Sequence, residues 1–145
     1  VGLAAPQVGV NVRLMVFNPE GVRGSGREYV LANPRIISTS NTTERGEEGC
    51  LSFITDKGLI LGDVDRATMV KIKAQDENGA KFQLKLEGWT ARIFQHEFDH
   101  LQGKLFVDAD RMIAEDRAAA AEELQKLEAE FAALHPGVEA ESVVS

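Results

Sequence analysis

Short apolar runs and alternating patterns fill the first two thirds of the chain. β-Branched and aromatic residues dominate residues 11–17 and 28–37, and the stretch between them is rich in Gly, Pro and Asn, which predicts two strands joined by a turn. In residues 67–88, apolar and charged positions alternate on both sides of Asn78-Gly79, a pair that favours a turn with positive φ. This segment predicts a β-hairpin, and this part of the chain is expected to be mostly β.

A helical period replaces the alternation from residue 90 onward. Residues 90–103 (TARIFQHEFDHLQG) predict a helix that begins with Thr90 as N-cap and ends at Gly103. A second helix is expected from about Ala109 to Leu134. Its apolar residues recur at three- and four-residue steps and are expected to dock against the body of the domain: Leu124, Leu127, Phe131 and Leu134. Strands followed by helices predict an α+β fold.

Length and composition narrow the class of protein. A chain of 145 residues suits one domain, which we expect to span residues 1–135, with a core at 1–108, a helix at 109–135 and a disordered tail at 136–145. The apolar fraction of 43% and the charged fraction of 27% are ordinary for a soluble protein. No apolar run is long enough to span a membrane. The formal net charge of −7 argues against direct nucleic-acid binding, which needs clustered Lys and Arg.

One five-residue pattern carries recognisable chemistry. Residues 96–100 (HEFDH) match HExxH, in which His96 and His100 lie one helical turn apart and can bind one metal ion. Glu97 then lies beside the metal. A catalytic metal site needs a third protein ligand and an open position for water, so another part of the chain must supply that ligand.

Three positions are candidates for the third ligand. Phe106 occupies the place of a histidine in one HExxH pattern and cannot bind a metal. Glu122 or Glu123 has the spacing of a glutamate on a following helix, but both lie among the Ala, Glu and Lys residues of a solvated face. Cys50 is the remaining candidate. Its thiolate is a strong ligand for zinc or ferrous iron, and the flanking Gly49 lets the backbone approach closely.

Three stretches of the chain resemble a known family. VGLAAPQ (residues 1–7), EEGCLS (47–52) and QHEFDHLQG (95–103) occur in this order and closely resemble the three signature motifs of peptide deformylase. Enzymes of this family remove the formyl group from the N-terminal formylmethionine of nascent polypeptides and release formate. The resemblance runs from Val1 to about Met112 and is greatest to plastid forms, such as the plant chloroplast form, and to related bacterial forms. It implies antiparallel β-sheets around a central metal-binding HExxH helix, followed by a long C-terminal helix.

The resemblance also implies roles for individual residues. One divalent ion, Fe²⁺ or Zn²⁺, would be held by Cys50, His96 and His100. Glu97 would act as the general acid and base, and the oxyanion would be stabilised by Gln7 and the backbone N–H of Leu51. Substrate contacts would come from the backbone of Val1, Gly2 and Gly49, and the residues near the methionine pocket would be Glu48, Arg92 and Ile93.

The implied partners are the N-formylmethionyl peptides of nascent chains, with ribosome association as a further expectation and no membrane partner. The implied location is the bacterial cytoplasm, or the stroma or matrix of a plastid or mitochondrion. Because the chain begins without Met, we expect it to be N-terminally incomplete, with any targeting segment upstream. Residues 53–63 (FITDKGLILGD) are expected to form a loop longer than the family usually has.

Two alternatives to a deformylase stay open. An HExxH peptidase would use Glu122 or Glu123 as its third ligand and would keep its metal when Cys50 is replaced. A non-catalytic relative would keep the metal as a structural clip, and would release no formate from a formyl-Met peptide. Metal retention after replacement of Cys50 therefore separates the peptidase from a deformylase. Formate release separates the non-catalytic relative from a deformylase.

Overall fold

The computed structural model describes residues 1–139 and residue 142. Two compact units are formed: unit one comprises Val1–Glu44 and Arg66–Leu105, and unit two comprises Arg45–Asp65 and Phe106–Ser145. The elements are β1 (Gly2–Ala4), the 3₁₀ turn η1 (Ala5–Val8), β2 (Leu14–Phe17), β3 (Tyr29–Thr39), β4 (Thr43–Thr55), β5 (Gly58–Ala67), β6 (Met69–Gln75), β7 (Lys81–Glu87), α1 (Gly88–Leu101) and α2 (Ala114–Leu134). The predicted α+β class, with antiparallel strands before two helices, is confirmed.

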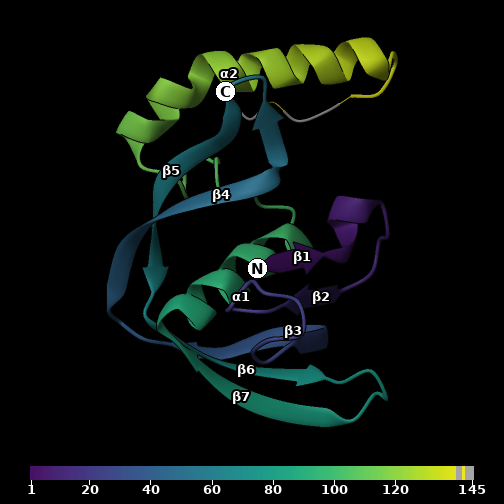
Figure 1. Cartoon of the computed structure of the whole chain (residues 1–145), viewed down its shortest axis with the longest axis vertical. Helices are drawn as coiled ribbons and strands as arrows, with labels where there is room; N and C mark the ends of the chain where they lie inside the picture. Colours follow the sequence, from purple (N-terminus) through teal and green to yellow (C-terminus); the bar gives the residue numbers. More distant parts are fainter. Residues whose placement is uncertain (140–141, 143–145) are drawn as a thin grey trace. The chain divides into compact units, whose positions relative to one another are not determined.

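Unit one is built on a five-stranded antiparallel sheet with the strand order β1-β2-β3-β6-β7 (Figure 1). The alternation predicted for residues 67–88 is the β6–β7 hairpin, in which Val70, Ile72 and Ala74 are buried while the lysines between them are exposed. At its turn, the carboxylate of Asp76 accepts hydrogen bonds from the backbone N–H groups of Asn78 and Ala80, both at 2.8 Å. The predicted hairpin is therefore confirmed.

Helix α1 packs against one face of this sheet (Figure 1). Its inward residues join the strand residues in one apolar core formed by Met15, Phe17, Leu31, Val70, Ile72, Ala74, Leu86, Ala91, Ile93 and Phe94. The predicted N-cap, Thr90, lies inside the helix, and the N-cap is Glu87. The chain turns directly from β7 into the helix because Gly88 adopts a φ of +55°, a conformation that favours glycine, and its N–H donates to the Thr68 carbonyl.

Unit two contains the two-stranded β4–β5 sheet and α2. Residues 53–63, expected as a loop, belong largely to these strands, which are joined by a short turn after Thr55. Phe53 and Phe106 pack edge to face with ring centroids 5.6 Å apart. A Cβ on Gly62 would lie 2.6 Å from the Met112 side chain, so that the absence of a side chain lets Met112 cover this strand.

The second helix begins at Ala114 rather than at Ala109, because Ile113 is extended, with a ψ of 149°, and its N–H donates to the Asp63 carbonyl at 2.9 Å. Of its apolar stripe, Leu124 is buried, whereas Leu134 is 76% exposed. The predicted docking of the stripe therefore holds for the first half of α2 and fails towards its end.

Trp89, at the start of α1, is 54% exposed, and its indole N–H donates to the Pro19 carbonyl at 3.0 Å. Of the tail predicted to be disordered, residues 140–141 and 143–145 lie outside the described part of the chain. Neither of the described helices is long and apolar enough to cross a membrane.

Candidate active site

Helix α1 places the two histidines of the HExxH pattern on one face. His96 is half-buried, His100 is buried, and their ring centroids lie 5.2 Å apart. Two imidazoles that bind one ion at about 2.0–2.1 Å with a tetrahedral angle have centroids roughly 5 Å apart. The pair therefore fits one metal ion without a change in backbone.

Glu97, the residue after the first histidine, is 3% exposed and lies against the backbone of β1. A Cβ built on Gly2 would overlap the Glu97 carboxylate, so only glycine allows this approach. Strand β1 packs directly against α1, and the contact of Gly2 with Glu97 belongs to this packing. The edge strand thus restricts where the carboxylate can lie.

The short turn η1 follows β1 and carries Gln7. The side-chain Oε1 of Gln7 accepts a hydrogen bond from the Ala4 N–H at 2.8 Å. Because a backbone N–H can only donate, this contact identifies the accepting atom as oxygen and fixes the orientation of the amide. The donor atom of the amide, Nε2, therefore takes no part in this contact.

Two side-chain contacts hold α1 at its place on unit one. The Gln95 amide pairs with both backbone groups of Ala67: Oε1 accepts from its N–H at 3.1 Å and Nε2 donates to its carbonyl at 2.9 Å. Arg66, the preceding residue, forms a buried ion pair with Asp99 at 2.5 Å. Gln95 immediately precedes His96 and Asp99 immediately precedes His100, so both contacts fix the part of the helix that carries the two histidines.

The C-terminal end of α1 is held by Arg13. Its guanidinium donates to the Leu101 carbonyl at 3.0 Å, to the Gln102 side chain at 2.9 Å and to the Pro34 carbonyl at 3.3 Å. A cation at a helix C-terminus interacts favourably with the helix dipole. Sequence reasoning missed the roles of Arg13, Arg66 and Gln95, because a contact between residues far apart in sequence leaves no periodic signal.

Four of the predicted site residues lie on β4. Glu48 and Cys50 are buried on one side of the strand, whereas Leu51 is 74% exposed. Cys50 is the only cysteine of the chain and forms no disulfide. Next to it, a Cβ on Gly49 would lie 2.6 Å from the Leu61 side chain, which explains the glycine by close strand packing. The strand alternation therefore turns the thiol inward and Leu51 outward.

The remaining predicted residues have mixed environments in unit one. Arg92 is buried and donates to the Glu44 carbonyl at 2.5 Å, and Ile93 belongs to the apolar core. Val1 is 71% exposed. Unit one thus brings together His96, Glu97, His100 and Gly2, while Glu48, Gly49, Cys50 and Leu51 belong to unit two.

The alternative ligands Glu122 and Glu123 are engaged by lysines. Glu123 accepts from Lys57 at 2.6 Å and from Lys126 at 3.0 Å, and Lys126 lies 3.1 Å from Glu122. The hydrogen bond from Lys57 is the larger cause, and that from Lys126 the smaller cause, of a lowered pKa of the Glu123 carboxyl. Both carboxylates therefore have cationic partners, which gives the peptidase alternative no support.

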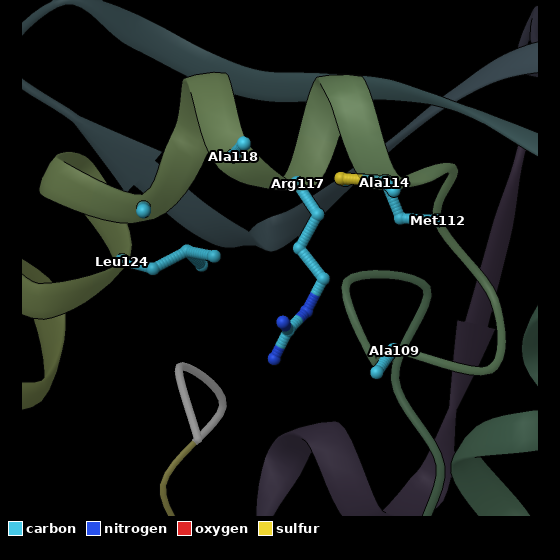
Figure 2. Close-up of a pocket in the computed structure, with 7 residues that line it drawn as sticks. Ala109, Met112, Ala114, Arg117, Ala118 and Leu124 are labelled. Atoms are coloured by element: carbon cyan, nitrogen blue, oxygen red, sulfur yellow. The ribbon is translucent and has the colours of Figure 1, made fainter.

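Unit two also contains a hollow of about 210 Å³ beside the first turns of α2 (Figure 2). Its walls are formed by alanines together with Met112 and Leu124, and the Arg117 side chain extends into the region between them. The Arg117 Nε donates to the Val107 carbonyl at 3.1 Å. The lining residues include no carboxylate, imidazole or thiol, so this hollow does not supply metal ligands.

A histidine pair that fits one ion, a buried glutamate between the two histidines and a sheet beneath them define an α+β protein with an HExxH metal-binding helix. The model of the polypeptide deformylase family matches residues 1–117, and the chain belongs to this family.

Relatives and solved structures agree with this membership. Chloroplastic peptide deformylase 1B of Oryza sativa subsp. japonica is 53% identical over 131 residues, which are 90% of this chain and 46% of that protein. Peptide deformylase of Symbiobacterium thermophilum is 44% identical over 97% of this chain and 60% of that protein. The crystal structure of Arabidopsis thaliana peptide deformylase 1B in complex with an inhibitor has a TM-score of 0.88 at 45% identity. The match covers 99% of this chain and 76% of that chain. The chain thus spans about half the length, or less, of the plant relatives it matches.

The buried ion pair predicts a stability effect. We expect Asp99→Asn to lower the free energy of unfolding by about 3 to 5 kcal/mol, because it removes a carboxylate charge beside the buried Arg66 guanidinium. The matched control is Asp65→Asn, which removes the same charge from the exposed Arg45–Asp65 pair and should destabilise the protein far less, because water screens exposed charges. Chemical denaturation measures both. Equal effects of the two substitutions would contradict the role given to the buried pair.

Proposed function

We propose that this protein is a metal-dependent hydrolase that removes the N-formyl group from the N-terminal formylmethionine of nascent polypeptides and releases formate. The observation that carries this proposal is the His96–His100 pair at 5.2 Å, with the buried Glu97 beside it, in a chain that belongs to the polypeptide deformylase family. Residues 1–135 would form the catalytic domain.

The proposed ligands of one divalent ion, Fe²⁺ or Zn²⁺, are Cys50, His96 and His100. The support is their chemistry: a buried thiol and two imidazoles are the donor types that both metals accept. When bound, such an ion lowers the pKa of a bound water towards neutrality and polarises a carbonyl group. Elemental analysis after anaerobic purification would identify the metal, because a ferrous site with a thiolate ligand is sensitive to oxygen.

Glu97 is the proposed general acid and base. A carboxylate at this position can accept the proton of the attacking water and then donate it to the departing amine nitrogen. Its burial excludes bulk water, and the contact with Gly2 limits its positions. These two features favour one defined proton-transfer geometry over several.

Gln7 and the backbone N–H of Leu51 are the proposed oxyanion donors. The support for Gln7 is that its Oε1 accepts from the Ala4 N–H, which leaves Nε2 as the atom that would donate to the developing negative charge. One donor of this kind typically stabilises a transition state by about 3 to 4 kcal/mol.

The remaining assignments concern the substrate and its surroundings. We propose backbone contacts with the peptide at Val1, Gly2 and Gly49. Glu48, Arg92 and Ile93 would lie near the methionine pocket. We also propose ribosome association, and location in the bacterial cytoplasm or in the stroma or matrix of a plastid or mitochondrion. The support for an organelle is that plant relatives are named chloroplastic or mitochondrial.

Glu97→Gln tests the activity. The substitution keeps the size of the side chain but removes its ability to take a proton, so formate release from a formyl-Met peptide should fall about 100- to 10,000-fold. Metal content should stay unchanged by elemental analysis. Glu28→Gln, at an exposed position of unit one, is the matched control and should keep full activity. A metal-loaded wild-type protein without formate release would identify a non-catalytic relative instead.

Gly2→Ala tests the approach of β1 to the catalytic carboxylate. The added Cβ must displace Glu97, and we expect kcat for formate release to fall roughly 100-fold. Leu3→Ala, at the next and partly exposed position of the same strand, should change kcat little. Thermal unfolding shows whether Gly2→Ala stays folded, which distinguishes a displaced carboxylate from a disrupted strand. An unchanged kcat in folded Gly2→Ala would show that the contact does not position Glu97.

Cys50→Ala tests the third ligand. We expect metal affinity to fall by at least about 100-fold, more than is typical when a residue outside the ligand set is changed. Ser52→Ala, on the same strand, is the control and should retain metal. Retention of the metal in Cys50→Ala would favour an HExxH peptidase, in which another residue completes the site.

A further inference from the structure

The sheet of unit one has a cationic outer face. Opposite residues of an antiparallel pair share one face, and the registers pair Arg35 with Lys73, Lys71 with Lys85, and Gln75 with Lys81. The neighbouring residues Val70 and Ile72 are buried in the core on the α1 side. The other side of the sheet therefore carries an exposed group that we call the basic face: Arg35, Lys71, Lys73, Lys81 and Lys85.

This arrangement is unfavourable for the isolated sheet. Like charges directly opposite on neighbouring strands destabilise an antiparallel pair, and the basic face contains two such pairs, Arg35–Lys73 and Lys71–Lys85. Among the described contacts of the face, Lys85 has an acidic partner, Glu87 at 2.8 Å. The two acidic residues of the hairpin turn, Asp76 and Glu77, line a different hollow together with Phe82 and Leu84.

A backbone irregularity places Arg35 in this group. The register between β3 and β6 shifts between Ala32 and Arg35, and Asn33 has a φ of +50°, the one positive φ among the described residues other than glycine. Asn33 is held there by a hydrogen bond from its Nδ2 to the Gln75 Oε1 at 2.9 Å. β-Bulges of this kind re-aim side chains. The result is a hollow of about 280 Å³ beside the bulge, bounded by Asn33, Arg35, Lys73, Ala74, Gln75 and Lys81.

We propose that the basic face binds the phosphodiester backbone of a nucleic acid. Phosphate and sugar contacts are made by Lys and Arg together with Ser, Asn and Gln, and the polar residues on or beside this face are Asn33, Ser38, Gln75 and Gln83. The net charge of −7 argued against nucleic-acid binding when the sequence was taken as a whole, and the proposal departs from that expectation. The acidity is unevenly distributed: residues 109–145 carry nine acidic against three basic residues, whereas the lysines of β6 and β7 lie on one face of the sheet.

The composition of the face favours a nucleic acid over a membrane surface. Binding in a membrane interface needs apolar side chains that enter the lipid. Of the exposed apolar residues of this sheet, Leu3, Val16 and Val30 lie on β1, β2 and the start of β3, away from the lysines of β6 and β7. Ile36 and Ile37 are exposed on β3 next to β6, and Ile36 pairs with the core residue Ile72. Helix α1 occupies the opposite side of the sheet, so a nucleic acid on the basic face would not cover the helix or its histidines. This binding therefore goes beyond the proposed function.

The test measures binding of a fluorescein-labelled 20-nucleotide poly(U) RNA by fluorescence anisotropy between 50 and 200 mM KCl. Five contacts on a single strand predict a slope of log K against log salt of about −3.5, which is roughly a 100-fold loss over this range. In Lys71→Glu/Lys73→Glu, affinity at 50 mM should fall at least about tenfold and the slope should shrink to about −2. Poly(dT) of equal length decides whether RNA or DNA is preferred.

The matched control is Arg23→Glu/Arg27→Glu, which changes net charge equally at exposed positions outside the basic face and should keep at least half of the affinity. Thermal unfolding should show Lys71→Glu/Lys73→Glu folded, and formate release should be unchanged, so failure here is distinct from failure of the deformylase proposal. Absence of salt-dependent binding, or equal losses in both double variants, would overturn the proposal. Binding to vesicles with 30% phosphatidylserine without binding to either polynucleotide would overturn it in favour of a membrane.

Discussion

The placement of α1 on its sheet depends first on the buried ion pair between Arg66 and Asp99. Two charges away from water are tolerated only when they are close and well oriented, so this pair admits few alternative positions of the helix. Asp99 immediately precedes His100, and Gln95, which pairs with Ala67, immediately precedes His96. Each histidine therefore has a neighbour in the chain that is fixed to the strand end beside it.

The apolar core and these polar contacts have different functions. Apolar burial of Ile93 and Phe94 holds the helix on the sheet, but it is non-directional and would tolerate small rotations of the helix. The directed contacts of Gln95 and Asp99 define the rotation, and with it the side on which both imidazoles lie. On the strand side, the absence of a side chain at Gly2 completes the arrangement by admitting the Glu97 carboxylate.

The sequence predicted those features whose signal is local. The β6–β7 hairpin was visible as an alternation, and α1 was visible as HExxH at helical spacing. Strand β4 was hidden because glycines and acidic residues surround Cys50, although burial alternates along this strand. The start of α1 was misplaced because Thr90 is a good capping residue, whereas the actual turn depends on the positive φ of Gly88. The ion pair joins residues 33 positions apart, and no pattern in one sequence reports such a pairing.

Arg13 connects two parts of unit one that have been described separately. Its guanidinium donates to the last turn of α1 and to the Pro34 carbonyl, and its own carbonyl accepts the N–H of Asn33 in the bulge. A planar group with several N–H donors in a fixed fork can serve both sites at once. Lysine, with a single nitrogen on a flexible stem, could not contact both sites at once. The helix terminus and the bulge are thus cross-linked by one residue, so that replacing Arg13 would remove an anchor from both at once.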